Sequence, residues 1–264
     1  IGLGNMGAPM AANLANAGYE VVGFDVTDVT VEGVTSCSDA PSCVLGCDLV
    51  ITMLPNGSIL QKVADEIQQS LKKGAVFLDC STVDVDTAKL VAAQMAATDI
   101  DMLDAPVSGG ISGAAAGTLT FMVGGTSKAF AIAEPLFTVM GNKAVHVGAA
   151  GAGQAVKICN NMILGVTMIA TCESIALGDK LGLDRQKLFD VLSTSSGASW
   201  TVNSYFPAPG VGPVSPADND YKPGFAAELM VKDLGLSQQA AEAVNADTPM
   251  GAHALALYQQ FVGT

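Results

Sequence analysis

Short apolar runs alternate with helical segments through the first 150 residues, and this alternation limits the folds open to the chain. The strand-like runs cover residues 19–25, 48–55, 75–82, 101–107, 119–125 and 143–148. Strands rich in Val, Ile, Leu and Phe that alternate with helices are typical of βαβ units, in which a largely parallel sheet is covered on both faces. We therefore predict an α/β domain over residues 1–150.

Strand signals stop after residue 150, and the rest of the chain is helical in pattern. Residues 152–181 predict one helix of about 30 residues, near 45 Å long at about 1.5 Å per residue. A second helix is expected from Asp184, and two more lie beyond a Pro- and Gly-rich loop at residues 204–224. The sequence thus predicts an all-helical domain, residues 151–264, that is entered through one long helix.

The composition excludes two classes of partner. Half of the residues are hydrophobic, which permits a large core, and the net charge is −13. Binding to a phosphate backbone needs an excess of Lys and Arg, so no nucleic-acid partner is expected. The long segment 158–178 is interrupted by Asn160, Asn161 and Glu173. It therefore falls short of the roughly 18 apolar residues of a membrane span, and no membrane partner is expected.

The cysteines and histidines do not predict a metal site. None of the six Cys forms a CxxC pair, and several lie in apolar runs, which is typical of reduced thiols in an intracellular protein. A site at Cys37, Cys43 and Cys47 would lack a fourth ligand and a nearby His. His146 and His253 have no metal spacing either. We expect no metal, and we expect acid–base chemistry to use a residue other than His.

The first seven residues contain three glycines whose spacing suggests a binding function. Gly2, Gly4 and Gly7 form GxGxxG before a helical segment, and the next strand ends in Asp25, 21 residues after Gly4. Such glycines let the backbone approach a pyrophosphate, whose charge lies at the helix N-terminus. Asp25 would accept hydrogen bonds from both ribose hydroxyls and repel a 2′-phosphate, and no Arg or Lys follows it in DVTDVT. This predicts a Rossmann-type NAD-binding domain, with a turn of purely structural function as the alternative.

Four separated segments resemble the β-hydroxyacid dehydrogenases, and the resemblance covers nearly the whole chain. The segments, in the family's order, are GLGNMGAPMAANL, DAPVSGGISGAAAGTLTFMVGG, GAGQAVKICNN and GFAAELMVKDLGL. The resemblance implies NAD as the cofactor. It also implies cofactor contacts by the following residues beyond the three glycines and Asp25: Asn5, Met6, Met53, Leu54, Pro55, Thr82, Phe225 and Lys232.

The segment GAGQAVKICNN carries the predicted catalytic group. By resemblance, Lys157 is the catalytic Lys and Asn161 orients the substrate hydroxyl, while Asn160 is a weaker candidate for substrate contact. The pKa of a free Lys is about 10.4. Burial on an apolar helix is expected to lower it, so that Lys157 can act as an acid and base near neutral pH. Asn161 lies one helical turn further on, on the same face.

Two further segments are predicted to contact the substrate. Ser108, Gly109 and Gly110 match the family's substrate loop, where a hydroxyl and open backbone N–H groups can bind a small carboxylate. A Gly-rich loop without a ligand is the alternative. Trp200 could form the wall of an apolar pocket for a substrate methyl group, and a Trp that only packs in the core is the alternative.

The resemblance implies oxidation of a small β-hydroxy acid to a semialdehyde by hydride transfer. The long loop at residues 195–225 favours 3-hydroxyisobutyrate, a metabolite of valine catabolism. Two alternatives stay open. One is a related β-hydroxyacid dehydrogenase or semialdehyde reductase, with tartronate semialdehyde, 3-hydroxypropionate or glyoxylate as the substrate, and the other is a catalytically inactive dinucleotide-binding module. 6-Phosphogluconate is excluded, because the chain has only 12 Lys and Arg in all and too small a helical domain.

The resemblance also bears on the ends, the assembly and the location of the chain. Family members begin a few residues earlier and end later, so the first strand is expected to be truncated and a helical tail to be missing. The helix at residues 152–181 is apolar on most faces, which predicts a homodimer or homotetramer through the helical domain. A cytoplasmic location is expected in a bacterium, and the mitochondrial matrix in a eukaryote.

Overall fold

The computed structural model describes residues 1–222 and 224–263. Pro223, in the predicted Pro- and Gly-rich loop, and Thr264, at the end of the predicted helical domain, lie outside the described residues. The chain divides into two compact units, Ile1–Lys157 and Ile158–Thr264.

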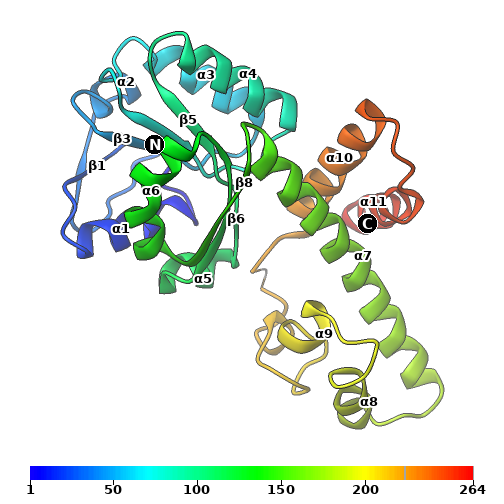
Figure 1. Cartoon of the computed structure of the whole chain (residues 1–264). Coiled ribbons are helices and arrows are strands. Elements are labelled where there is room, and N and C mark those ends of the chain that lie inside the picture. The colour runs from blue at the N-terminus through cyan, green and yellow to red at the C-terminus, as the bar shows by residue number, and fades with distance from the viewer. Residues whose placement is uncertain (223, 264) are drawn as a thin grey trace. The chain divides into compact units, whose positions relative to one another are not determined.

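The first unit is built on a mostly parallel sheet (Figure 1). Six strands have the order β3-β4-β5-β7-β6, with β8 paired to β7, while β1 and β2 form a separate parallel pair. Strands β3, β4 and β5 are parallel, and β7 is antiparallel to β5 and β6. The strands are β1 (Val21–Gly23), β2 (Val34–Ser36), β3 (Leu49–Thr52), β4 (Val76–Asp79), β5 (Asp101–Asp104), β6 (Val107–Ser108), β7 (Leu119–Gly125) and β8 (Gly141–Gly148).

The first two residues lie between the two sheets. The N-terminal amine of Ile1 donates to Ile51 O of β3, and Met53 N donates to Ile1 O. Gly2 N donates to Phe24 O, directly after β1. These backbone hydrogen bonds link β1 to β3, so the edges of the two sheets are joined through Ile1 and Gly2.

Helices cover both faces of the sheet in this unit (Figure 1). All four residues of β4 are buried, as expected for a central strand with helices on either side. One core joins α1, α5 and α6 to the sheet around Phe121 and Phe137, and the other joins α2, α3 and α4 to it around Phe77. The helices are α1 (Gly7–Asn16), α2 (Ala40–Cys43), α3 (Gly57–Ile67), α4 (Val85–Ala96), α5 (Gly110–Ala116) and α6 (Ser127–Met140).

The second unit contains only helices and loops among its described residues. One apolar cluster packs α10 and α11 around Leu234 and Met230 against the middle of α7, and a second gathers around Phe206 with side chains of α7, α8 and α9. The helices are α7 (Ala152–Lys180), whose first turns belong to the first unit, α8 (Arg185–Leu192), α9 (Trp200–Ser204), a 3-10 turn (Pro216–Asp218), α10 (Ala227–Ala243) and α11 (Pro249–Val262).

This architecture confirms the predicted Rossmann-type domain followed by a helical region that begins with one long helix. The long strands and helices lie where the sequence pattern places them. The elements that were not predicted are short, and they are β2, β6, α2, α5 and α9. Segments of two to seven residues contain too few positions for a periodic pattern to stand out.

Helix α7 corrects one expectation from the sequence. By length and composition alone it is apolar enough to cross a membrane, with a mean hydropathy of 1.4 over its most apolar window. No uninterrupted apolar run in α7 reaches the length of this window, but the window stays apolar on average although it includes the two Asn residues and a charged group. The core helix of a soluble protein passes the same test, so the finding is weak evidence for a membrane span.

Candidate active site

The glycine turn has two positions that require glycine and one that is open. A Cβ on Gly2, which has a φ of +86°, would lie 2.4 Å from Met53 O, and a Cβ on Gly7 would lie 1.9 Å from Gly2 O. No atom lies within 4 Å of a Cβ built on Gly4. Gly2 and Gly7 therefore let the turn pack, whereas the space beside Gly4 is free at the start of α1. Asn5 is exposed and Met6 half-buried in the same turn.

Asp25 lies beside this turn. Its Oδ2 accepts a hydrogen bond from Leu3 N at 2.6 Å, and its Oδ1 accepts from Thr27 N and Oγ1 at 2.8 and 2.7 Å. Burial opposes its ionisation, but the hydrogen bonds from Thr27 and Leu3 outweigh burial and hold the pKa of Asp25 below its usual value. An ionised carboxylate therefore faces a cavity of about 450 Å³ that is lined by residues 23–29 and 36–38.

A buried carboxylate ties together the ends of β3 and β4. Asp79 Oδ1 accepts hydrogen bonds from Thr52 Oγ1 at 2.7 Å and from Ser81 Oγ at 2.6 Å. Ser81 Oγ in turn accepts from Leu54 N at 2.8 Å. Burial raises the pKa of Asp79 to about 6, although the hydrogen bonds from Ser81 and Thr52 act against it. This network links the two loops that carry the predicted cofactor residues Met53–Pro55 and Thr82. The role of Asp79 was not predicted.

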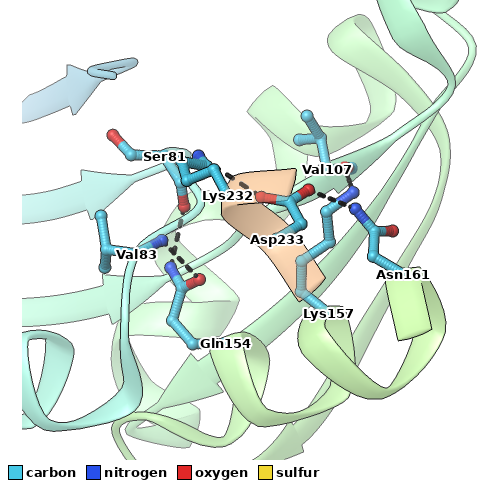
Figure 2. A network of polar contacts seen from close by, with 8 residues as sticks. All are labelled: Ser81, Val83, Val107, Gln154, Lys157, Asn161, Lys232 and Asp233. Carbon is cyan, nitrogen blue, oxygen red and sulfur yellow. Dashed lines mark hydrogen bonds and ion pairs between the residues drawn. The ribbon is translucent and has the colours of Figure 1, made fainter. Parts of the chain in front are cut away.

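Lys157 reaches the predicted substrate loop within the first unit. Its side chain is buried, with 7% of its surface exposed, and Nζ donates to Val107 O at 2.7 Å (Figure 2). Val107 immediately precedes Ser108, the last residue of β6, and Gly109 then joins β6 to Gly110 at the start of α5. The structure thus brings the predicted acid–base residue next to the segment that is predicted to hold a carboxylate.

Two residues that were not predicted as site residues hold the start of α7. Asp104, at the end of β5, accepts hydrogen bonds from Gly151 N at 2.7 Å and from Gln154 N at 3.0 Å. Burial raises the pKa of Asp104, and these hydrogen bonds act in the opposite direction. Gln154 bonds to Ser81 O and Val83 N (Figure 2). The available signal was a Gln three residues before Lys157 on an apolar helix.

In the second unit, the predicted Asn161 is held by a buried carboxylate. Asn161 Nδ2 donates to Asp233 Oδ2 at 2.5 Å (Figure 2). Its Oδ1 accepts from Asn160 Nδ2 at 2.9 Å. Lys232 Nζ lies 3.4 Å from Asp233 Oδ1. Asn160 is exposed, whereas Asn161, to which it donates this hydrogen bond, is fully buried. Asp233 follows Lys232 in the family-like segment, but it was not predicted as a site residue.

Trp200 is not a core residue. It is 56% exposed, and its ring stacks on Tyr205 with centroids 5.1 Å apart, which makes the alternative of a Trp that only packs in the core wrong. Tyr205 accepts hydrogen bonds from the backbone at Gly224 and Phe225, and burial raises its pKa. Phe225 is 38% exposed. Trp200 is the first residue of α9, and Tyr205 directly follows the last. Tyr205 was not predicted as a site residue.

The described residues contain no group of three or more His, Cys, Asp or Glu that could hold a metal ion, and the six cysteines are free thiols. The predicted site residues supply a buried amine, amides, hydroxyls and backbone N–H groups. The first unit adds a glycine turn and an ionised Asp25, which suit a dinucleotide.

Two family models together match almost the whole chain. The model of the NAD binding domain of 6-phosphogluconate dehydrogenase matches residues 1–148. The model described as "NAD-binding of NADP-dependent 3-hydroxyisobutyrate dehydrogenase" matches residues 151–263. The first of these shows that residues 1–148 form an NAD(P)-binding domain, without distinguishing the two cofactors.

Individual relatives match over the same length. A probable 3-hydroxyisobutyrate dehydrogenase of Mycobacterium tuberculosis is 46% identical over 99% of this chain and 90% of its own. An NAD-dependent L-serine dehydrogenase of Pseudomonas aeruginosa is also 46% identical, over 98% of this chain and 90% of its own. A solved structure of the M. tuberculosis 3-hydroxyisobutyrate dehydrogenase with L-serine superimposes with a TM-score of 0.94 at 46% identity, and it covers 99% of this chain and 92% of its own.

Proposed function

Because the chain belongs to the 3-hydroxyisobutyrate dehydrogenase group of the β-hydroxyacid dehydrogenases, we propose that it oxidises 3-hydroxyisobutyrate to methylmalonate semialdehyde with NAD. The observation that carries the proposal is the hydrogen bond from buried Lys157 to Val107 O, directly before the Ser108 loop. It supports a proton-accepting role for Lys157 beside the loop that is proposed to bind the substrate carboxylate.

In the proposed mechanism, the substrate carboxylate binds to the Ser108 hydroxyl and to the backbone N–H groups of Gly109 and Gly110. Neutral Lys157 takes the proton from the substrate hydroxyl, and Asn161 orients that hydroxyl with its amide. Bound NAD would accept the hydride from the carbinol carbon. Lys157 must begin each oxidation as a neutral amine in order to accept this proton.

Other residues are proposed to hold the cofactor. The turn from Gly2 to Gly7 would hold the pyrophosphate at the N-terminus of α1, and Asp25 would accept from the ribose hydroxyls. The loops at Met53–Pro55 and Thr82 would contact the adenosine and nicotinamide sides. The resemblance to the family assigns Phe225 and Lys232 to cofactor contact as well.

The charge of Asp25 predicts a preference for NAD over NADP. Its carboxylate would repel a 2′-phosphate at close range. We expect Asp25→Asn to lower the ratio of kcat/KM for NAD to that for NADP by about tenfold, which corresponds to about 1.4 kcal/mol. The measurement is steady-state kinetics with each cofactor at saturating substrate.

Asp28 provides the matched control for this experiment, because it is exposed and lines the same cavity. Asp28→Asn removes an equal charge without removing the predicted ribose contact, so the cofactor ratio should stay within about twofold. A wild-type enzyme that prefers NADP would refute the role given to Asp25.

The substrate itself is tested by a panel of hydroxy acids. L-Serine is the second candidate, because a relative named for that activity is as similar to this chain as the hydroxyisobutyrate enzyme is. Serine carries an ammonium group where 3-hydroxyisobutyrate carries a methyl group. We expect kcat/KM for NAD reduction to be highest with 3-hydroxyisobutyrate among that acid, L-serine, 3-hydroxypropionate and glycerate. A higher value with L-serine would reverse the assignment, and activity with none would favour an inactive dinucleotide-binding module.

Exposed apolar side chains of the helical unit bear on the assembly of the protein. Large apolar side chains on α7 and α11 are exposed in the single chain, including Ile163 at 63%, Leu177 at 61% and Phe261 at 70%. Burial of these side chains against a second copy would remove them from water, so we propose a homodimer or homotetramer through the helical unit. Light scattering measures the mass of the assembly directly.

The two relatives are bacterial, and we propose a cytoplasmic enzyme.

A further inference from the structure

Gln154 makes two hydrogen bonds to the loop that follows β4. It lies in the first turn of α7 and is fully buried. Its Nε2 donates to Ser81 O at 2.8 Å, and its Oε1 accepts from Val83 N at 3.1 Å (Figure 2). One primary amide thus satisfies a buried backbone acceptor and a buried backbone donor more than 70 residues away in the sequence.

The two bonded residues stand on either side of Thr82. The loop is fixed from its other side too, because the Ser81 hydroxyl bonds to Asp79 and accepts from Leu54 N. The backbone of Gln154 is itself anchored, since its N–H donates to Asp104 Oδ2 at 3.0 Å. Gln154 therefore joins two backbone segments that are each held independently, and its side chain sets their separation.

Lys157 lies three residues after Gln154, on the same side of α7 one turn further along. A shift of the start of α7 relative to the loop would therefore change the distance from Lys157 to Thr82. Every contact in this chain of bonds lies within the first unit, Ile1–Lys157.

We propose that Gln154 is a positioning residue that sets the geometry of hydride transfer by fixing Thr82 relative to Lys157. The inference rests on the proposed function, in which Thr82 contacts the nicotinamide side of NAD and Lys157 takes the proton. Gln154 touches neither substrate nor cofactor in this proposal. It acts through the Ser81–Val83 loop.

The effect should fall on the chemical step. A misplacement of about 1 Å costs about 100-fold in rate for a well-oriented reaction, and part of that displacement is expected when both hydrogen bonds are removed. The turn at Gly2–Gly7 and Asp25 would keep their own contacts with the cofactor. Cofactor affinity should therefore change much less than kcat.

The test is Gln154→Met in the full chain, because Met is neutral and of similar length but makes neither bond. We expect kcat to fall about tenfold, the Kd for NADH to change less than threefold, and the primary deuterium isotope effect on the carbinol hydrogen to increase. Gln154→Asn, which keeps both polar groups on a side chain one methylene shorter, should give an intermediate kcat and serves if the Met variant does not fold.

Gln94→Met is the matched control. Gln94, on α4, donates to Asp65 Oδ1 and Gln68 Oε1 and accepts from Gln61 Nε2, so the substitution removes hydrogen bonds between α3 and α4 instead. It should lower Tm while leaving kcat and the isotope effect unchanged. The proposal is overturned if Gln154→Met also lowers only Tm, or if NADH affinity falls in parallel with kcat.

Failure of the proposed function would be recognised separately. If the wild-type chain oxidises no acid of the panel, or if Lys157→Ala retains turnover, the assignment of the reaction is wrong whatever Gln154 does. The fluorescence of bound NADH then tests the positioning role without turnover. The emission of the nicotinamide should differ between wild type and Gln154→Met, and identical emission would overturn the inference.

Discussion

Replacing Lys157 by Ala is expected to lower kcat by on the order of 10³ while the chain still binds NADH. General acid–base catalysis contributes about 10²–10⁴ to the rate of such reactions, and no His takes part in the proposed site. The contacts assigned to the cofactor, from the Gly2 turn to Asp25, do not involve the Lys157 side chain. The measurements are steady-state kinetics with the best substrate of the panel and fluorescence titration with NADH.

Two variants separate chemistry from packing in this experiment. Lys157→Arg keeps a positive charge but cannot release its proton near neutral pH, so it should be nearly as inactive as the Ala variant. Lys180→Ala removes an exposed Lys from the last turn of the same helix and should leave kcat unchanged. Near-normal turnover in Lys157→Ala would refute the mechanism.

Replacing Gly4 by Ala is expected to weaken NAD binding about 100-fold without changing stability. A Cβ at this position meets no protein atom within 4 Å, so the folded chain accommodates it. The same open space is where a pyrophosphate would approach the backbone. A methyl group forced into that contact costs about 1–3 kcal/mol, equivalent to about 5- to 150-fold in Kd. The measurements are NADH titration and thermal unfolding.

Gly7→Ala is the comparison variant, because it should lower stability as well as cofactor binding. Its Cβ would lie 1.9 Å from Gly2 O, so the backbone of the turn itself must move. We expect this variant to lose about 3 kcal/mol or more of unfolding free energy as well as cofactor binding. If Gly4→Ala binds NADH as tightly as the wild type, the pyrophosphate does not lie at this turn.

Much of the fold was predictable, because its signals are local. The apolar pattern of β4 predicts a strand buried on both faces, and the 29 residues of α7 carry a helical pattern long enough to be recognised. The antiparallel placement of β7 between β5 and β6 was not predictable, because pairing depends on which distant strands meet.

Some residues of the candidate site were likewise predictable from local motifs, and others were not. Lys157, Asn161, Asp25 and the Ser108 loop were named from motifs, and these assignments stay predictions. Asp79 was not predicted, because an Asp at a strand end cannot be distinguished from an ordinary polar residue until its neighbours are known. Its three acceptor contacts come from Thr52, 27 residues away, and from Ser81.

The sequence by itself determined the class of this protein, since glycine spacing, strand-end acids and helical periodicity are properties of short segments. It also placed a Lys and two Asn on an apolar helix, which required an explanation. Only the tertiary structure decided which distant groups bond to the polar side chains of this helix: Val107 O for Lys157, Asp233 for Asn161, and the Ser81–Val83 loop for Gln154. The physical reason is that a buried polar group must find a hydrogen-bond partner, and that partner is chosen by folding rather than by distance along the chain.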